Sequence, residues 1–137
     1  MNFLLDTCVI SDFFKKHPSV TEHLQSASPE QIYISSVTVM EVEYGLHLHS
    51  DRTKKLMPLW KDLIGLIAIV PFSPECALAA AKIRSGLKRD GRLIGPYDIL
   101  IAGSALSHDM VLVTSNTNEF NRISDLNLED WRVTSSG

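Results

Sequence analysis

The chain has 137 residues, with 13 Lys+Arg against 16 Asp+Glu and a formal net charge of −3. At this length we expect a single domain, residues 1–137, and the 45% of hydrophobic residues excludes a disordered chain. The acidic balance argues against a protein that coats DNA, but it remains compatible with a nuclease that carries one local basic patch.

Targeting and membrane segments are not expected. The longest uncharged apolar run, residues 63–72, is about half of the ~20 residues that a membrane-spanning helix needs. The N-terminus has no basic region and reaches Asp6 at once, unlike a signal peptide. Cys8 and Cys76 lie far apart and form no paired motif. We therefore expect a cytoplasmic protein with free thiols and no membrane partner.

Strand-like runs alternate with helix-like stretches along the chain. We expect strands at residues 3–5, 31–34, 67–70, 110–114 and, as a last short one, 131–133. We expect helices at residues 8–16, 19–26, 36–48, after 51, 74–90 and from 96 onward. Serine N-caps, prolines in first turns and Gly91 after the fifth helix support these boundaries.

This alternation, without hairpin signals, predicts an α/β fold in which helices cover both faces of a parallel sheet. Ligand sites of such sheets lie beyond the carboxyl ends of the strands. The residues that directly follow each strand are therefore the candidates for function.

Asp6 follows the first expected strand immediately. It is either a carboxylate at the functional edge of the sheet or only the N-cap of the next helix. Asn116 follows the strand at 110–114, and Glu119 comes three residues later. A polar residue at Asn116 is also ordinary turn chemistry.

Glu41 lies in the helix at 36–48, beside one of two apolar stripes that arise at about 100° per residue. The stripe next to Glu41, which we expect to be buried, is Val37, Met40, Tyr44 and Leu48. The opposite stripe, which needs cover from neighbouring helices or a second subunit, is Val39, Val42 and Leu46. A glutamate beside a buried stripe must be paired, neutralised or bound to a metal, unless it reaches solvent.

Asp98 lies in the first turn of the helix that begins at Gly95-Pro96. It shares a face with Ile101, Ala102 and Ala105, which should point into the protein. An acid at this position also stabilises a helix N-terminus. A capping role alone, however, would not require Asp98 to lie on the apolar face.

Together, these side chains would meet at one edge of the sheet. Carboxylates packed together repel one another unless a cation lies between them. Mg²⁺ binds a few carboxylates while keeping several waters, and such a site can activate water against a phosphodiester. Other chemistries lack their motifs: the sequence has no phosphate-binding glycine loop, no nucleophile elbow and no helical histidine pair for zinc. Cys8 is interpreted as a small packing residue, because the nearby Asp6 would raise its pKa.

A basic cluster precedes Asp98 in the sequence, with Asp90 as its only acid: Lys82, Arg84, Lys88, Arg89 and Arg92. It either compensates a helix C-terminus or follows RNA phosphates beside the acidic site, with Lys88, Arg89 and Arg92 as the candidates.

Four segments also carry a family resemblance: Leu4-Leu5-Asp6-Thr7, residues 34–41 ending at Glu41, residues 92–98 ending at Asp98, and residues 112–120 around Asn116. They resemble, in order and spacing, the motifs of the PIN-domain family, and more closely those of its VapC-type toxin branch. Residues 126–131 look like the C-terminal segment of that branch, so the similarity covers nearly the whole chain.

The resemblance implies a PIN-like three-layer α/β fold with a central five-stranded parallel sheet flanked by helices. It implies an endoribonuclease that depends on Mg²⁺ or Mn²⁺, a paired antitoxin protein that covers the site, and a homodimer. Asp6 and Asp98 would bind the metal directly, and Glu41 would bind a water on the ion or a second ion. RNA, in particular tRNA or rRNA loops, would be the substrate.

Asn116, with Thr7 and Thr114, would orient the ligands. Many PIN domains carry an aspartate where Asn116 stands, so the site takes one or two ions, and Glu119 is the other candidate for the fourth position. Two alternatives remain. One is a PIN-like module without catalysis that binds RNA or a partner. The other, an aspartyl-phosphate phosphatase, is disfavoured because a second acid does not follow Asp6 in a D-x-D pair.

Overall fold

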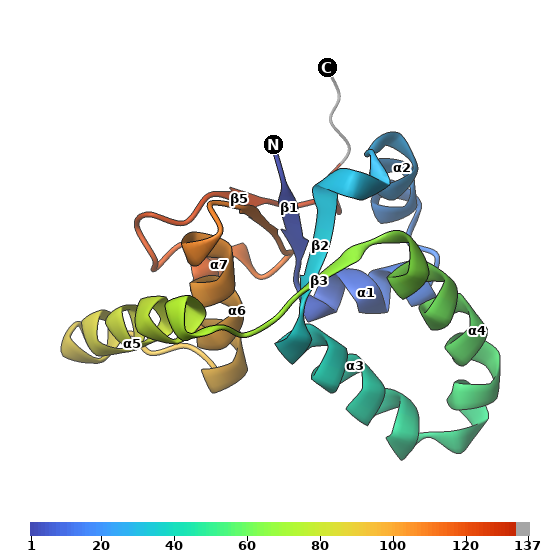
Figure 1. Ribbon diagram of the computed structural model, residues 1–137, viewed down its shortest axis with the longest axis horizontal. Coiled ribbons are helices and arrows are strands. Elements are labelled where there is room, and N and C mark those ends of the chain that lie inside the picture. Colours follow the sequence, from blue (N-terminus) through green and yellow to red (C-terminus); the bar gives the residue numbers. More distant parts are fainter. Residues whose placement is uncertain (134–137) are drawn as a thin grey trace.

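The computed structural model describes residues 1–133, and its centre is a five-stranded sheet in the order β3-β2-β1-β4-β5 (Figure 1). All four strand pairings are parallel. The strands are β1 (Phe3–Leu5), β2 (Ile32–Ser35), β3 (Ala68–Val70), β4 (Val111–Val113) and β5 (Leu128–Glu129). The α/β fold with a parallel sheet, predicted from the alternation of elements, is confirmed.

Helices cover both faces of this sheet (Figure 1). They are α1 (Thr7–Phe14), α2 (Pro18–Ser26), α3 (Ser36–Leu48), α4 (Ser50–Leu66), α5 (Pro74–Arg89), α6 (Pro96–Ser107) and α7 (Thr117–Phe120), with a 3₁₀ turn, η1 (Pro29–Gln31). In Figure 1, α1 to α4 lie to one side of the sheet and α5 to α7 to the other. Neither the 3₁₀ turn nor α7 was anticipated from the sequence.

Successive strand residues contribute to two separate cores. Leu4 and Leu112 pack with residues of α5 and α6, whereas Leu5, Ile34 and Val113 pack with residues of α1 to α4. This alternation follows from the two-residue period of a strand. The strands are hydrophobic on both faces, as expected for a parallel sheet that is covered on both sides.

The predicted helix starts and stops have the expected local chemistry. Ser35 Oγ accepts a 3.0 Å hydrogen bond from Val37 N, and Ser73 Oγ accepts a 3.3 Å hydrogen bond from Cys76 N. Gly91, after α5, has a φ of +67°, a conformation that favours glycine. Gly103 allows α5 and α6 to approach closely, because a Cβ atom there would lie 2.9 Å from Ala80.

The expected last strand at residues 131–133 is wrong. The fifth strand is Leu128–Glu129, and Leu128 pairs with Leu112 of β4. Trp131 lies in a turn, where its ring packs on Phe3 with 5.5 Å between ring centres. Trp131 is therefore buried through side-chain packing on the first strand, not through membership of the sheet.

The prediction that the α3 stripe beside Glu41 is buried is wrong for most of that stripe, whereas the opposite stripe is covered by a neighbouring helix, one of the two alternatives left open. Val42 and Leu46 are 7% and 4% exposed and belong to the core. The stripe beside Glu41 is open to solvent over most of its length, with Met40, Tyr44 and Leu48 at 42%, 62% and 59% exposure. The reason is that α4 folds back over the face with Val42 and Leu46, where it places the fully buried Trp60. Helix hydrophobicity alone could not decide which stripe α4 would cover.

Among residues 1–133, no helix combines the length and the apolar character that crossing a bilayer requires. Both cysteines are free, as expected: Cys8 is half-buried and Cys76 is buried.

Candidate active site

The carboxyl ends of β1 and β4 mark the point where the strand order reverses. From β1 the chain moves toward β2, whereas from β4 it moves to β5 on the opposite side. The connecting loops therefore diverge there and leave a crevice, which is the usual ligand site of an open α/β sheet. The residues just after these two strands are Asp6 and Thr114.

Asp6 is held in the crevice by three hydrogen bonds. It forms the N-cap of α1, and its Oδ1 accepts a 2.8 Å hydrogen bond from Thr7 N. Its Oδ2 accepts hydrogen bonds from Thr114 Oγ1 at 2.8 Å and from Cys8 Sγ at 3.4 Å. Asp6 is 4% exposed, and this burial raises the pKa of its carboxyl group, although the three hydrogen bonds oppose the rise.

Glu41 approaches from α3 and is anchored to the start of α1. Thr7 Oγ1 donates a 2.7 Å hydrogen bond to Glu41 Oε1. Thr38, one turn before Glu41, is fully buried, and its Oγ1 lies 3.4 Å from Thr7 Oγ1. The hydroxyl of Thr7 thus fixes the direction of a carboxylate from a different helix. Thr38 was not recognised from the sequence, where it is one of several hydroxyl residues in the segment.

Asp98 approaches from α6, on the other side of the sheet, and is half-buried. The pKa of its carboxyl group is raised to about 6, first by burial and then by the negative charges of Asp6, Glu119 and Glu41. The carboxylates of Asp6, Glu119 and Glu41 are therefore close enough to Asp98 to repel its charge. As expected, Ile101, Ala102 and Ala105, on the same helix, are fully buried.

Asn116 and Glu119 lie at the start of α7, next to Thr114. The backbone N of Asn116 donates a 3.0 Å hydrogen bond to Thr114 Oγ1. Its side-chain Nδ2 donates a 3.1 Å hydrogen bond to Glu119 Oε2. Asn116 therefore links Thr114, whose hydroxyl donates a hydrogen bond to Asp6, with Glu119, whose charge helps to raise the pKa of Asp98.

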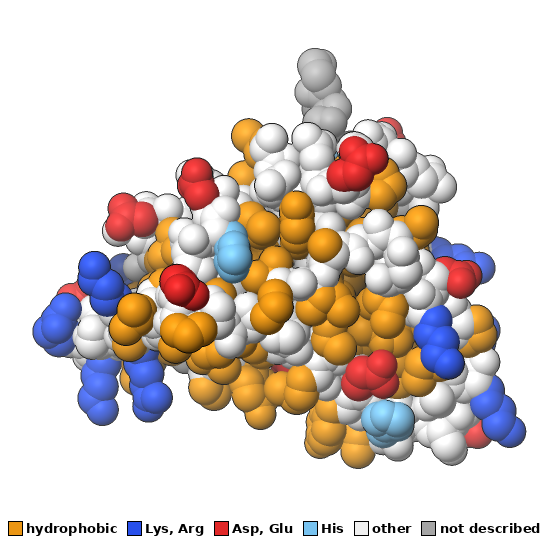
Figure 2. All heavy atoms as spheres, viewed as in Figure 1, with side chains coloured by type: hydrophobic (Ala, Val, Ile, Leu, Met, Phe, Trp, Pro, Cys, Tyr) orange, Lys and Arg blue, Asp and Glu red, His pale blue; other side chains and the backbone are white. Residues whose placement is uncertain are grey.

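The structure thus brings together seven residues proposed from the sequence: Asp6, Thr7, Glu41, Asp98, Thr114, Asn116 and Glu119. It does not bring the basic residues Lys88, Arg89 and Arg92 into this hydrogen-bonded cluster. They are exposed on the last turn of α5 and just after it. Figure 2 shows Lys and Arg side chains gathered at the left of the view, where Figure 1 places α5.

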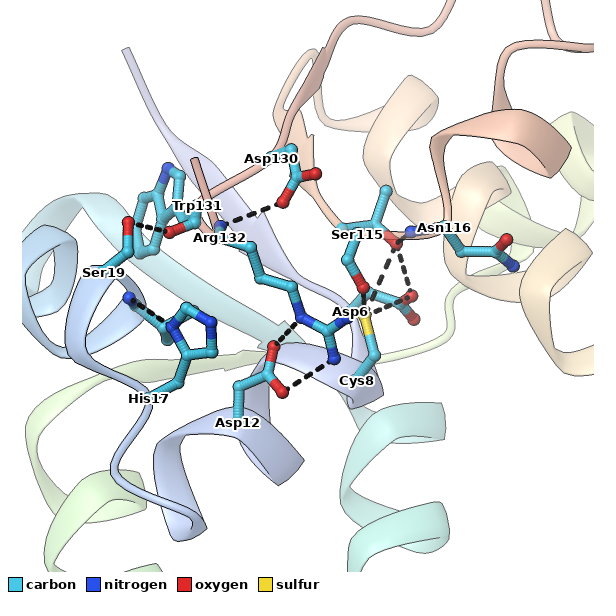
Figure 3. Close-up of polar contacts among 12 residues, drawn as sticks. Asp6, Cys8, Asp12, His17, Ser19, Ser115, Asn116, Asp130, Trp131 and Arg132 are labelled. Atoms are coloured by element: carbon cyan, nitrogen blue, oxygen red, sulfur yellow. Dashed lines mark hydrogen bonds and ion pairs between the residues drawn. The ribbon is translucent and has the colours of Figure 1, made fainter. Parts of the chain in front are cut away.

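Cys8 has more contacts than a simple packing residue would have (Figure 3). Besides its hydrogen bond to Asp6, its Sγ lies 3.6 Å from Thr114 Oγ1 and 3.5 Å from Ser115 Oγ. Burial and the charge of Asp6 raise the pKa of the Cys8 thiol, as expected. The neutral thiol is therefore a hydrogen-bond donor to the carboxylate and not a nucleophile.

The donor set suits a hard divalent cation, because it consists of oxygens, and because the carboxylates among them carry negative charges that repel one another. Within residues 1–133, no three acidic, histidine or cysteine side chains lie close enough to be ready as a set of metal ligands. Binding of one ion by Asp6, Glu41 and Asp98 would therefore draw these side chains closer together than they stand in the structure.

Comparison with known proteins gives the same picture. Residues 3–126 match the PIN domain family. The chain is 33% identical over 131 residues to a protein of Shigella flexneri named tRNA(fMet)-specific endonuclease VapC, covering 96% of this chain and 98% of the relative.

Two crystal structures share the fold over nearly their whole length. The first, of DNA-bound VapBC from Salmonella typhimurium, has a TM-score of 0.88 and 32% identity, covering 96% of this chain and 98% of that chain. The second, of VapBC2 from Rickettsia felis bound to a DNA fragment of its promoter, has a TM-score of 0.87 and 32% identity, covering 96% and 99%. The chain belongs to the PIN-domain family, and within it to the VapC-type branch of toxin ribonucleases.

Proposed function

We propose that this chain is a toxin endoribonuclease that hydrolyses RNA phosphodiester bonds with Mg²⁺ or Mn²⁺. The observation that carries the proposal is the convergence of Asp6, Glu41 and Glu119 on Asp98 beyond the carboxyl ends of β1 and β4, where burial first and then these three charges raise the pKa of Asp98 to about 6. A protein gains little stability from four repelling acids, so their convergence indicates a cationic ligand.

In this proposal Asp6, Asp98 and Glu41 hold the ion. Thr114 and Thr7 fix the directions of Asp6 and Glu41 through hydrogen bonds of 2.8 Å and 2.7 Å. Such partners of metal ligands typically account for about 10–100-fold in metal affinity or activity.

Asn116 restrains Glu119 and supports Thr114. Glu119 adds negative charge near Asp98. It is the candidate for the fourth position of the site if a second ion binds.

A divalent ion supplies, when bound, the Lewis acidity that allows water to attack a phosphodiester at neutral pH. The chain provides the oxygens, their orientation and their charge. With a pKa of about 6, Asp98 is largely ionised at pH 7. It becomes protonated under mild acidity, and the proton then competes with the ion.

The substrate class and the partner follow from the relatives. The Shigella flexneri relative is named as specific for tRNA(fMet), and we extend the class, tRNA, to this chain. Loops of structured RNA present unstacked bases that a protein can read. The VapBC structures indicate a cognate antitoxin protein as the partner. The homodimer and the cytoplasmic location remain predictions.

The test is cleavage of total tRNA by the purified chain with Mn²⁺, with Mg²⁺ and with EDTA. We expect cleavage with either ion, none with EDTA, and none by the Asp98→Asn variant, whose folding is checked by its melting curve. Matching Asp90→Asn, on the exposed end of α5, is the control and should cleave normally. If a folded wild-type chain binds tRNA but never cleaves it with either ion, the alternative of a non-catalytic binding module is correct.

A further inference from the structure

The last described turn of the chain is fastened to α2. Ser19 Oγ donates a 2.8 Å hydrogen bond to the carbonyl oxygen of Trp131. The Trp131 ring stacks on His23 with 5.2 Å between ring centres and 8° between ring planes. Because Trp131 is only 3% exposed, the backbone of the next residue, Arg132, starts from a fixed position.

Arg132 directs its side chain onto a buried acid (Figure 3). Its Nε donates a 2.7 Å hydrogen bond to Asp12 Oδ2, and its Nη2 donates a 2.9 Å hydrogen bond to Asp12 Oδ1. The Asp12 side chain is 6% exposed, whereas that of Arg132 is 48% exposed. Two of the five N–H donors of a guanidinium are used in this pair, and within residues 1–133 the other three have no hydrogen-bond partner.

The guanidinium lies beside the carboxylate site. Cys8 lies near the guanidinium in Figure 3, and its Sγ lies 3.4 Å from Asp6 Oδ2. In Figure 3 the Arg132 side chain runs from its backbone near Trp131 to Asp12, and its guanidinium lies between Asp12 and Cys8. An RNA backbone that enters this site meets the repelling charges of several acids, so a fixed cation at the wall of the site would offset part of that repulsion.

We propose that Arg132 binds a phosphate group of the RNA next to the cleaved bond, and that Asp12 positions the guanidinium for this contact. The inference rests on the proposed nuclease function. A planar guanidinium held by a bidentate carboxylate presents its remaining donors in one direction, which suits a phosphate. Arg132 is held by a carboxylate, and in this it differs from Lys88 and Arg89, which are exposed on α5 and form no ion pair among residues 1–133.

The test measures RNA binding and cleavage separately. Binding is followed by the anisotropy of a short fluorescein-labelled single-stranded RNA, with Mg²⁺ and in an Asp98→Asn background that prevents cleavage. Arg132→Gln should weaken binding about ten-fold and lower the slope of log affinity against log salt by ~0.7. Arg52→Gln, which removes the same charge from the exposed start of α4, is the control and should change neither.

Asp12→Asn separates positioning from charge. It leaves the Arg132 charge in place but removes the carboxylate that directs it. In a chain with Asp98 intact, we expect Asp12→Asn to keep the KM for RNA while kcat falls several-fold. Arg132→Lys should keep the wild-type salt slope with a lower kcat, and it serves as the second variant if Arg132→Gln does not fold.

If Arg132 only fastens the C-terminal turn, these variants should lower the melting temperature but leave RNA affinity and kcat of the folded protein unchanged, and that result overturns the inference. Loss of antitoxin binding alone in Arg132→Gln overturns it too. Failure of the wild type to cleave any RNA would refute the proposed function, whereas the anisotropy comparison would still decide whether Arg132 binds phosphate.

Discussion

The hydroxyl group of Thr7 donates a 2.7 Å hydrogen bond to Glu41 Oε1, which joins the first turn of α1 to the middle of α3. Thr7 directly follows Asp6, whose Oδ1 accepts a hydrogen bond from Thr7 N. One residue therefore fixes two carboxylates, one through its backbone and the other through its side chain.

Thr7→Val tests this arrangement, because it removes the hydroxyl with little change in volume. We expect RNA cleavage to fall about 10–100-fold, since Glu41 loses the partner that directs it. The melting temperature should change little, because Thr7 is only half-buried. Thr7→Ser keeps a hydroxyl and should retain most of the activity. Equal loss in both variants would mean that the hydrogen bond is not the reason for the effect.

The raised pKa of Asp98 predicts how the free energy of unfolding of the metal-free protein depends on pH. Its pKa is about 6 in the folded chain against an ordinary value of 3.8, so the folded state binds this proton more tightly than the unfolded state. The stabilising contribution of the protonated group is fully present below pH 3.8 and is lost as the pH rises through about 6.

The measurement is urea unfolding of the wild type and Asp98→Asn across this pH range in EDTA. Asparagine carries no charge at any of these pH values, so Asp98→Asn should lack the decline near pH 6 and be the more stable protein at pH 8. A parallel decline in both proteins would show that Asp98 does not carry the mutual repulsion.

Three substitutions, at Asp98, Asn116 and Glu119, test which of these side chains binds the ion and which only positions another residue. We expect Asp98→Ala to lose most cleavage activity, because the ion then lacks both a charge and an oxygen. Asn116→Ala should be intermediate, since it releases Glu119 and leaves Thr114 in place. Glu119→Gln should be mildest, because a glutamine oxygen can still accept from Asn116 Nδ2. If Glu119→Gln is as damaging as Asp98→Ala in a metal titration of the cleavage rate, Glu119 is the fourth ligand.

Asn116→Asp restores the acid that many PIN domains carry. It should keep activity and tighten binding of the divalent ion. The structure adds a cost: the new carboxylate would face Glu119 Oε2 across a contact that is now a 3.1 Å hydrogen bond. Without an ion we therefore expect a lower melting temperature than in the wild type, and with Mn²⁺ a larger increase. A variant that is as stable as the wild type in EDTA would contradict this reasoning.

The burial of Leu46 in the core predicts that a charge at this position unfolds the protein. Leu46→Glu would bury a charge at a position that is 4% exposed, so it should unfold the protein, at a cost of about 4 kcal/mol or more. Tyr44→Glu, at 62% exposure, should alter stability by only about 0.5 kcal/mol. Denaturant unfolding of both variants decides between them. A folded Leu46→Glu monomer would restore the idea that this stripe is a subunit interface.

The sequence predicted most of the fold because its signals are local. Ser35 and Ser73 mark helix starts, because each accepts a hydrogen bond from a backbone N–H in the first turn. Gly91 marks a helix end, because its φ is positive. The placement of Asp6 and Asp98 followed from the rule that parallel strands and the helices after them present their ends at one edge of the sheet.

What the sequence could not provide depends on contacts between distant residues. The burial of Trp131 against Phe3 and His23 could not be distinguished from that of a strand residue. The pair of Asp12 and Arg132 joins residues that are 120 positions apart. No periodicity or spacing links them, and only the folded chain shows that they pair.

Divalent-ion binding by these acids is tested most directly by the melting temperature of the wild type and Asp98→Asn as Mn²⁺ is added. We expect Asp98→Asn to melt higher in EDTA, because one repelling charge is gone, and Mn²⁺ to raise the melting temperature of the wild type alone. An ion at about 100 times its Kd would stabilise the wild type by about 2.7 kcal/mol. If Mn²⁺ raises both melting temperatures equally, or neither, the acids of this site do not hold a divalent ion together and the central claim is wrong.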